Sequence, residues 1–332
     1  MKKAFFTALA IFWLAACSQP DGAPSLSEED GAGPANNQSL SGDSNLFNSL
    51  KNPNSQKLVY HVGPVDLLAG ESGELTLENA ESLNFQVSEP VWVTGFNPKV
   101  IDADGRELSG QLLHKAILFN KSEPNPVCAT GNGGNPFAAA TSALTKVELP
   151  EGFGYPLLPD DPLEAKVVFQ NKSEQDFLSV MFEFDLETVP MEQAQAYSDV
   201  KAVLLDPDPC EHKPLTLEPG EFIETNKTFT IPEGGHLMVA NGVLSNYGVA
   251  VSLTHSEGGD VSVIPFWRAE AQLNADHQIV DLTPNPFLDP EGKKINEGDK
   301  MTLGISFDNF SNSWNNEATG GAMIYLAPEN PS

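Results

Sequence analysis

Short apolar runs separated by turn residues make up most of the chain after residue 57. Between Phe85 and Thr94 apolar and polar side chains alternate along much of the segment, and Asp104-Gly105 is a hairpin signal. The 27 glycines and 26 prolines fall mainly between the runs, and only Met191–Tyr197 has the pattern of a helical turn. We therefore predict an all-β fold of the sandwich or jelly-roll kind, with strands at 85–94, 99–102, 113–119, 165–170, 178–184, 200–205, 249–253, 261–266, 279–282 and 301–307.

A change of composition over residues 187–198 separates two clusters of predicted strands. Domain boundaries fall in such segments, so we place an N-terminal β-sandwich at 57–190 and a C-terminal β-sandwich at 191–332. Residues 17–56 are rich in Ser, Asn, Gly, Pro, Asp and Glu and have few apolar side chains to bury. This composition predicts a disordered linker ahead of the two domains.

The start of the chain has the pattern of an export signal. Lys2 and Lys3 precede an apolar run that is too short to span a membrane as a helix. The segment Leu14-Ala15-Ala16-Cys17 resembles the lipobox of bacterial lipoproteins, in which the signal peptide, here residues 1–16, is removed and the cysteine is lipidated. The resemblance implies acyl chains such as palmitate on Cys17, a membrane as partner and the bacterial cell envelope as location. Ser18 is compatible with sorting to the outer membrane; the alternative is an ordinary signal peptide with a chance cysteine.

The sequence has 46 acidic and 18 basic residues and a formal net charge of −28. A surface with this charge repels phosphate backbones, so we exclude nucleic acid as a partner. The same charge keeps a protein soluble in a salty exterior, where repulsion is screened. Since 19% of the residues are charged, we interpret most of the acidic excess as a solvated surface and not as a binding site.

Cys128 and Cys210 are the cysteines that remain if Cys17 is lipidated. Both lie in proline-rich segments, at 124–128 and 206–210. Two cysteines in an exported protein more often pair than stay free, so the compartment favours a disulfide between them.

Several segments, taken in their order along the chain, resemble the copper type II, ascorbate-dependent monooxygenases. That superfamily includes peptidylglycine alpha-hydroxylating monooxygenase and dopamine beta-monooxygenase, and the similarity extends from residue 57 to residue 328. It implies two tandem nested antiparallel jelly-roll domains, each with one copper site at the cleft between them. The segments are Val91–Phe96, Val100–Gly105, Leu112–Phe119, Gly152–Pro156, Pro232–Met238 and Gly298–Met301.

The resemblance assigns the first copper site to an adjacent pair of histidines and a third histidine on a later strand. His114 matches the first member of the pair, but Lys115 stands at the second position and Gln170 at the third. An ammonium and an amide do not replace two imidazoles as copper ligands. A buried, hydrogen-bonded core histidine is the alternative interpretation of His114.

The second copper site of the family has a His-x-His pair and a methionine. His236 matches the first histidine, and Met238 replaces the second. Alternation on a strand puts both side chains on one face, and a thioether favours Cu(I). The family's methionine position falls near Thr319, while a small change of register offers Met323. The alternative is that these methionines fill the core.

These assignments lead to three hypotheses about function. In the first, the protein is an envelope-anchored, non-catalytic relative that binds copper weakly or at a single site. In the second, it is an active copper-dependent monooxygenase, an oxidoreductase, with one remodelled centre at His236 and Met238. In the third, it is a cell-surface adhesion or carbohydrate-binding module, which exposed aromatic side chains at Trp267, Trp314 or Tyr325 would favour. Fold alone does not separate the three.

Other candidate chemistry in the sequence is weaker. Asp102–Glu107 has part of the spacing of a calcium loop, but it has too few ligands and we interpret it as a hairpin turn. His61, His212, His255 and His277 are scattered, with no triad or zinc pattern around them. The sequence has no nucleophile elbow, phosphate loop or dinucleotide fingerprint.

Overall fold

The computed structural model describes residues 55–70, 76–128, 133–256 and 265–329. The predicted signal peptide, Cys17, nearly all of the predicted linker and most of the predicted strand at 261–266 lie outside these residues. The described residues belong to one compact unit. In the described part of the chain, no helix combines the length and the apolar character needed to cross a membrane.

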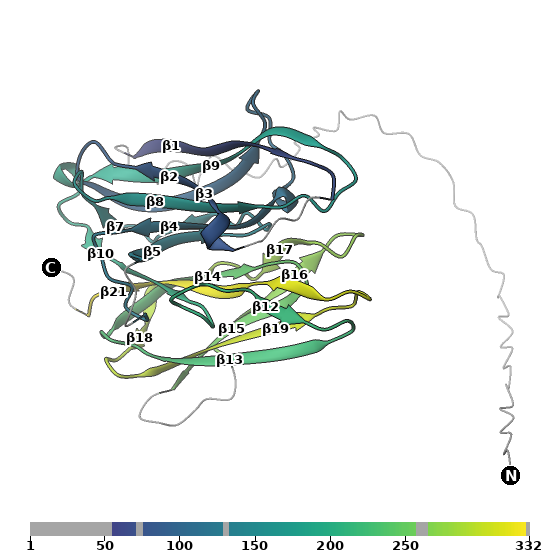
Figure 1. Cartoon of the computed structure of the whole chain (residues 1–332). Coiled ribbons are helices and arrows are strands. Elements are labelled where there is room, and N and C mark those ends of the chain that lie inside the picture. The colour runs from purple at the N-terminus through teal and green to yellow at the C-terminus, as the bar shows by residue number, and fades with distance from the viewer. Residues whose placement is uncertain (1–54, 71–75, 129–132, 257–264, 330–332) are drawn as a thin grey trace, which may run out of the picture. The chain divides into compact units, whose positions relative to one another are not determined.

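The described residues form β-strands almost throughout, as predicted. Their only helical elements are the 3₁₀ turns η1 (Leu77–Asn79), η2 (Gly110–Leu112) and η3 (Met191–Gln193), the last of which lies in the predicted helical turn. The strands build two tandem, almost entirely antiparallel jelly-roll sandwiches, which confirms the predicted fold class (Figure 1). The domain boundary at residue 190 stays a prediction.

The first sandwich has two sheets. One contains, in spatial order, β1 (Gln56–Leu67), β9 (Phe177–Pro190), β3 (Val91–Ile101), β7 (Phe153–Leu157) and β10 (Ser198–Asp199), and β6 (Val147–Glu148) pairs with β3. The other contains β2 (Glu81–Phe85), β8 (Leu163–Phe169), β4 (Leu113–Asn120) and β5 (Asn135–Ala140). The pair of β10 with β7 is parallel.

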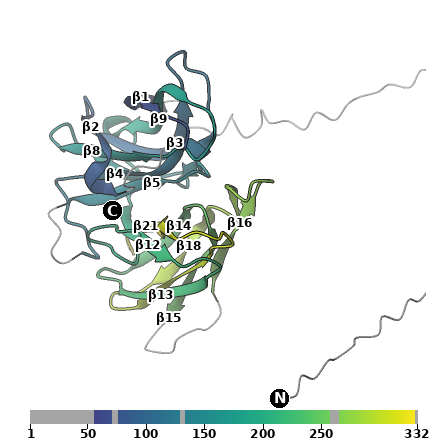
Figure 2. The ribbon, with the colours of Figure 1, turned by 45° about the vertical axis from the view of Figure 1, so that its right-hand side comes forward.

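The second sandwich contains the green and yellow strands in Figure 2. One sheet consists of β11 (Lys201–Leu205), β21 (Gly320–Ala327), β14 (Gly235–Leu244) and β18 (Phe287–Ile295). The other consists of β13 (Phe222–Thr230), β19 (Lys300–Asp308), β15 (Gly248–Ser256), β16 (Trp267–Leu273) and β17 (Ile279–Thr283). A separate pair is formed by β12 (Leu215–Leu217) and β20 (Asn315–Ala318).

The two sandwiches are internal repeats of one design. The order β1-β9-β3-β7 in the first corresponds to β11-β21-β14-β18 in the second, and β2-β8-β4-β5 corresponds to β13-β19-β15-β16. Irregularities of register recur at equivalent places: the bulge at Thr94 matches that at Met238, and the bulge at His114 matches that at Val249. Since bulges are specific features of a strand pair and not random defects, the match supports a true repeat.

Equivalent loops in the two sandwiches are closed by Asn171 and Asn309. The Nδ2 of each asparagine donates to three backbone carbonyls: those of Leu67, Leu68 and Gln175 in the first loop, and those of Leu217, Glu218 and Ser313 in the second. The hydroxyls of Ser173 and Ser311 donate to the asparagine Oδ1 atoms at 2.8 and 2.7 Å. The repeat therefore extends to individual hydrogen bonds.

In the sheet β11-β21-β14-β18, the strands β11, β14 and β21 are buried on both faces along most of their length, whereas the edge strand β18 is largely exposed. Alternate residues of β21 belong to different cores, since Met323 and Tyr325 pack with the first sandwich and Ala322 and Ile324 pack with the second. The Tyr325 hydroxyl donates to the carbonyl of Phe137 on β5 at 2.9 Å. The two sandwiches thus share a core, and the side chains of β11, β14 and β21 that point away from the second core are covered by the first sandwich.

Candidate functional site

His114, predicted as a copper ligand, lies at the bulge of β4 in a buried position. The residue is 2% exposed, and its Nε2 has no hydrogen-bond partner among the described residues. Burial, with a further contribution from the charge of Lys115, lowers the imidazole pKa to about 3. Gln170 is also buried, and its Nε2 donates to the carbonyl of Gln111 at 3.1 Å. This location offers one imidazole beside a buried ammonium, which is not a copper ligand set.

His236 and Met238 do lie together, over Gly292 of β18. A Cβ atom on Gly292 would lie 2.6 Å from His236 Cβ and 2.7 Å from Met238 Sδ. Met238 and Met323 are nevertheless core residues, 2% and 0% exposed, and Met323 pairs with Asn241 further along β14. Their thioethers fill the space between the sandwiches. Among the described residues, no group of three or more His, Cys, Asp and Glu side chains could hold a metal ion.

The turn that follows β11 was not predicted as a site, and it carries the buried polar residues Asp206 and His212. Asp206 Oδ1 accepts the backbone N–H of Asp208, and the Asp208 carbonyl accepts the N–H of His212, both at 2.8 Å. Pro207 and Pro209 restrict the backbone of this turn, and His212 ends it with a φ of 54°. The turn holds His212 next to the acidic residue that begins it.

A disulfide between Cys128 and Cys210 joins this turn to the loop after β4. The Nδ2 of Asn125 in the same loop donates to the Pro209 carbonyl at 3.0 Å. The covalent link and the hydrogen bond connect segments of the two sandwiches, so they fix the position of the turn against β4.

His212, Asp206 and Lys115 form a buried polar cluster. His212 Nδ1 lies 3.1 Å from Asp206 Oδ2, and Lys115 Nζ donates to the His212 carbonyl at 3.2 Å. All three residues are buried. Burial lowers the pKa of Lys115, and the carboxylates of Asp206 and Asp208 oppose this effect.

The internal repeat shows that the jelly-roll fold does not need the polar residues of β4. In the equivalent strand β15, Ala250 occupies the position of Lys115 and Val249 that of His114. A buried charge is expensive to desolvate, and a small apolar residue serves at the same position of the second sandwich. The lysine therefore marks a region that is specialised in the first sandwich.

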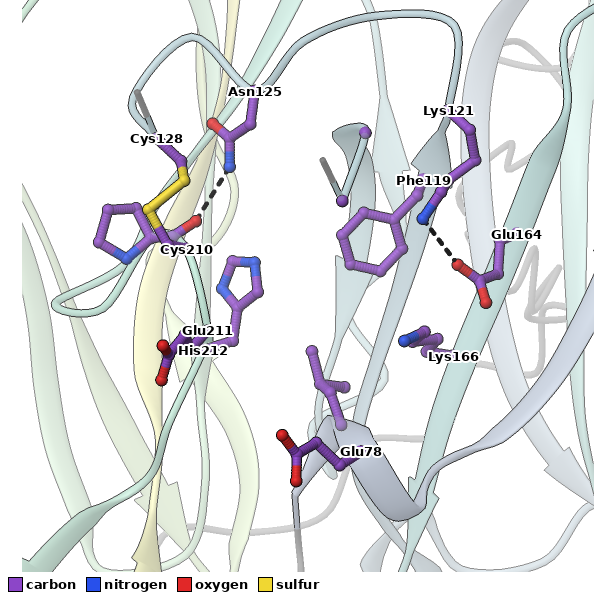
Figure 3. A pocket seen from close by; sticks show the side chains of 14 residues that line it. Glu78, Phe119, Lys121, Asn125, Cys128, Glu164, Lys166, Cys210, Glu211 and His212 are labelled. Atoms are coloured by element: carbon purple, nitrogen blue, oxygen red, sulfur yellow. Dashed lines mark hydrogen bonds and ion pairs between the residues drawn. A yellow bond between two sulfur atoms is a disulfide. The ribbon is translucent and has the colours of Figure 1, made fainter. Parts of the chain in front are cut away.

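Two cavities adjoin His212, with volumes of about 250 and 600 Å³. They share the lining residues Leu77, Glu78, Glu211 and His212. The smaller cavity, shown in Figure 3, is called the His212 cleft below. Its walls come from η1, the end of β4, β8 and the turn after β11, and include Phe119, Lys121, Glu164, Lys166 and His212.

Strand pairing explains which side chains of β4 and β8 face the cleft. Phe119 lies opposite Glu164, and Ile117 lies opposite Lys166, so these side chains share the face of the sheet turned away from its own core. Figure 3 shows the ring of Phe119 between His212 and the Lys121–Glu164 pair. The rings of Phe119 and His212 have centroids 6.2 Å apart.

The cations of the cleft differ in their partners. Lys121 forms an ion pair with Glu164 at 3.0 Å, and its ammonium lies 5.6 Å from the centroid of Phe119. Lys166 is half-buried and has no carboxylate within salt-bridge distance in the described part of the chain. Cys128 and Cys210, which also line the cleft, form the disulfide, so neither is a free nucleophile. The cleft thus combines an unpaired ammonium, an aromatic face and an imidazole.

The sequence matches no known protein family and no curated protein. Solved structures to which it is similar include PBCV-1 VP54, fitted into a reconstruction of the virophage Sputnik, with 8% identity, a TM-score of 0.27 and coverage of 82% of this chain and 94% of that one. For the STIV MCP these values are 6%, 0.36, 82% and 95%. For the major capsid protein P2 of bacteriophage PM2 they are 10%, 0.32, 83% and 100%.

These findings correct the resemblance drawn from the sequence. The similar structures given above are viral proteins and not copper monooxygenases, and no family model matches the chain. The assignment to that superfamily is therefore wrong. The two hypotheses that depend on it, a non-catalytic copper-binding relative and an active copper-dependent oxidoreductase, are withdrawn. Physically, the predicted ligands Met238 and Met323 fill a core, and His114 adjoins a buried ammonium.

The adhesion or carbohydrate-binding hypothesis is also withdrawn, because the similar structures given above do not specifically support it. Of its three aromatic residues, Trp267 and Tyr325 are each 4% exposed, and Trp314 is 61% exposed. The comparisons give the predicted lipid anchor no support. Cys17 lies outside the described residues, and its lipidation stays a prediction.

Proposed function

We propose that the protein is a non-catalytic binding protein whose ligand site is the His212 cleft, and that the ligand is a small molecule with an anionic group next to an apolar or aromatic part. One observation carries the proposal. No carboxylate of the described residues lies within salt-bridge distance of the Lys166 ammonium in the wall of this cleft, although the chain has 46 acidic residues to 18 basic ones. In so acidic a protein a half-buried lysine without a carboxylate partner is available for an external anion.

The neighbours of Lys166 support the second part of the proposal. The Phe119 ring offers an apolar face against which a ligand ring can pack. His212 lies on the side of this ring opposite the Lys121–Glu164 pair. A volume of about 250 Å³ suits a small molecule and not a macromolecule. Asp206 holds His212 from inside the protein through Nδ1, which orients the imidazole against the cleft.

Calorimetric titration with phenyl phosphate tests this proposal, since the probe joins an aromatic ring to an anion. We expect binding to the wild-type protein and a loss of about tenfold in affinity for Lys166→Gln, the size of effect that one charge-assisted hydrogen bond produces. Lys227→Gln is the matched control, because Lys227 is exposed on β13, away from the cleft. Failure of the wild-type protein to bind, or an equal loss in both variants, would refute the proposal.

For location, we propose that the protein is held at the bacterial cell envelope, on the outer membrane, through acyl chains on Cys17. The support is the lipobox-like segment ending in Cys17. In a bacterial host fed with an alkyne-labelled palmitate, the full chain should carry the label and sediment with membranes. Cys17→Ala should lose the label and appear in the soluble fraction, whereas Ser18→Ala should keep both properties. An unlabelled wild-type chain would contradict the anchor.

A further inference from the structure

A third cavity, of about 480 Å³, lies apart from the His212 cleft. Its walls combine prolines at 124, 126, 156, 232 and 328 with the aliphatic side chains of Val200, Val203 and Leu326. Prolines have little conformational freedom to lose, so these walls are rigid before any ligand arrives. The volume lies in the range of small-molecule sites.

The polar end of this cavity is built around Glu123. Its Oε2 accepts two hydrogen bonds, from the Tyr155 hydroxyl at 2.8 Å and from the Asn135 Nδ2 at 3.2 Å. Tyr155 is 2% exposed, and burial followed by the charge of Glu123 raises its pKa far above the ordinary value. The phenol therefore stays protonated and keeps donating to the carboxylate. Glu123 is held in one position by donors from β5 and β7.

The side-chain oxygen of Asn135 gives independent support for a ligand site, because it is a buried acceptor without a donor among the described residues. Its Nδ2 donates both to Glu123 and to the Ala202 carbonyl, each at 3.2 Å, which fixes the orientation of the amide. Its Oδ1 is therefore an acceptor, and it is buried without a hydrogen-bond partner among the described residues. Asn135 is 4% exposed and lines the cavity. Buried acceptors are seldom left unpaired in native proteins.

The charges around the cavity favour a cation. Glu123, Asp199 and Glu233 line it, with Lys201 as the one basic lining residue in the described part of the chain. The Lys201 ammonium is already paired with Glu233. The Glu123 carboxylate and the Asn135 amide oxygen thus line an apolar cavity, and no cation of the described residues pairs with either.

We infer that this cavity is a second ligand site, which takes a primary ammonium group carried on a short apolar chain. The ammonium donates to Glu123 and to Asn135 Oδ1, and the apolar chain packs against the proline and aliphatic walls. An ammonium matches the site because it has several donors and no acceptor, as two neighbouring acceptors require. The inference does not depend on the function proposed for the His212 cleft.

Calorimetric or NMR titration of the full chain with hexylammonium tests this inference, with hexanol and hexanoate as probes of the same length. We expect hexylammonium to bind at least tenfold more tightly than either. Glu123→Gln should lower the affinity for hexylammonium at least tenfold, while the glutamine carbonyl still accepts from Tyr155 and Asn135, so that the melting temperature measures intact folding.

Two controls make the result decisive. Glu151→Gln removes the same charge at an exposed position outside the cavity and should bind hexylammonium like the wild type. Lys166→Gln should also leave hexylammonium binding unchanged, because it affects the other cleft. Equal binding of hexanol, an unchanged affinity in a folded Glu123→Gln protein, or an equal loss in Glu151→Gln would each overturn the inference.

Discussion

Lowering the pH from 6.5 to about 3 is expected to reduce the free energy of unfolding by on the order of 4 kcal/mol through His114 alone. The imidazole is buried and neutral in the folded protein, and burial and the nearby Lys115 charge hold its pKa at about 3 instead of 6.5. Between pH 6.5 and pH 3 the His114 imidazole is therefore protonated in the unfolded chain and neutral in the folded protein. The stabilisation is fully present above pH 6.5 and is lost as the pH falls towards 3.

His114→Val is the variant that tests this expectation, because the second sandwich already has Val249 at the equivalent bulge. Urea unfolding at pH 7 and pH 4 gives the free energies. Between these values the wild type should lose about 3 kcal/mol more than the variant. Identical losses in the wild type and in His114→Val would show that His114 does not carry the effect.

Strand positions were largely readable from the sequence, because alternation and turn residues act locally. The predicted strands at 113–119 and 165–170 correspond to β4 and β8, and the turn predicted at Asp104-Gly105 has the hydrogen bond from Gly105 N–H to the Asp102 carbonyl at 3.0 Å. The single strand predicted at 85–94 was wrong, because the chain is not a strand between residues 85 and 91. β2 ends at Phe85 and β3 begins at Val91, since Pro90 cannot donate to a strand ladder.

The copper assignment was wrong because the alternation of side chains along a strand does not show what packs against each face. Alternation places His236 and Met238 on one face of β14, and the structure does bring them together over Gly292. Whether that face is open depends on what packs against it. Here the first sandwich covers the sheet, and Met238 and Met323 become part of a shared core. A strand that is buried on both faces cannot be told from one that lines a cleft by its own sequence.

The His212 cleft was missed because its residues are distant in the chain. Lys115 and His212, whose carbonyl it contacts, are 97 residues apart. A local signal was present: Asp206, Pro207 and Pro209 start a restricted turn that ends in a histidine two residues after Cys210. An acid and a histidine held by one turn indicate a pair in contact, but only the fold shows which lysines face it.

Replacing both Cys128 and Cys210 by serine is expected to lower the free energy of unfolding by about 4.5 kcal/mol, from the chain entropy of a cross-link across 82 residues. The bond joins the loop after β4 in the first sandwich to the turn after β11 in the second. Without it the unfolded chain gains conformations, while the folded protein keeps Asn125 as a remaining link to Pro209. The turn that holds His212 loses its covalent tie, so affinity at the His212 cleft should fall as well.

Urea unfolding of the double serine variant and of the wild type, each with and without a reductant, measures this effect. The reduced wild type should approach the stability of the variant, and the reductant should leave the variant unchanged, because no disulfide remains for it to break. Phenyl phosphate titration of the folded variant then separates stability from binding. A difference in stability below about 1 kcal/mol would mean that the unfolded ensemble is already restrained across this interval, against the chain-entropy account.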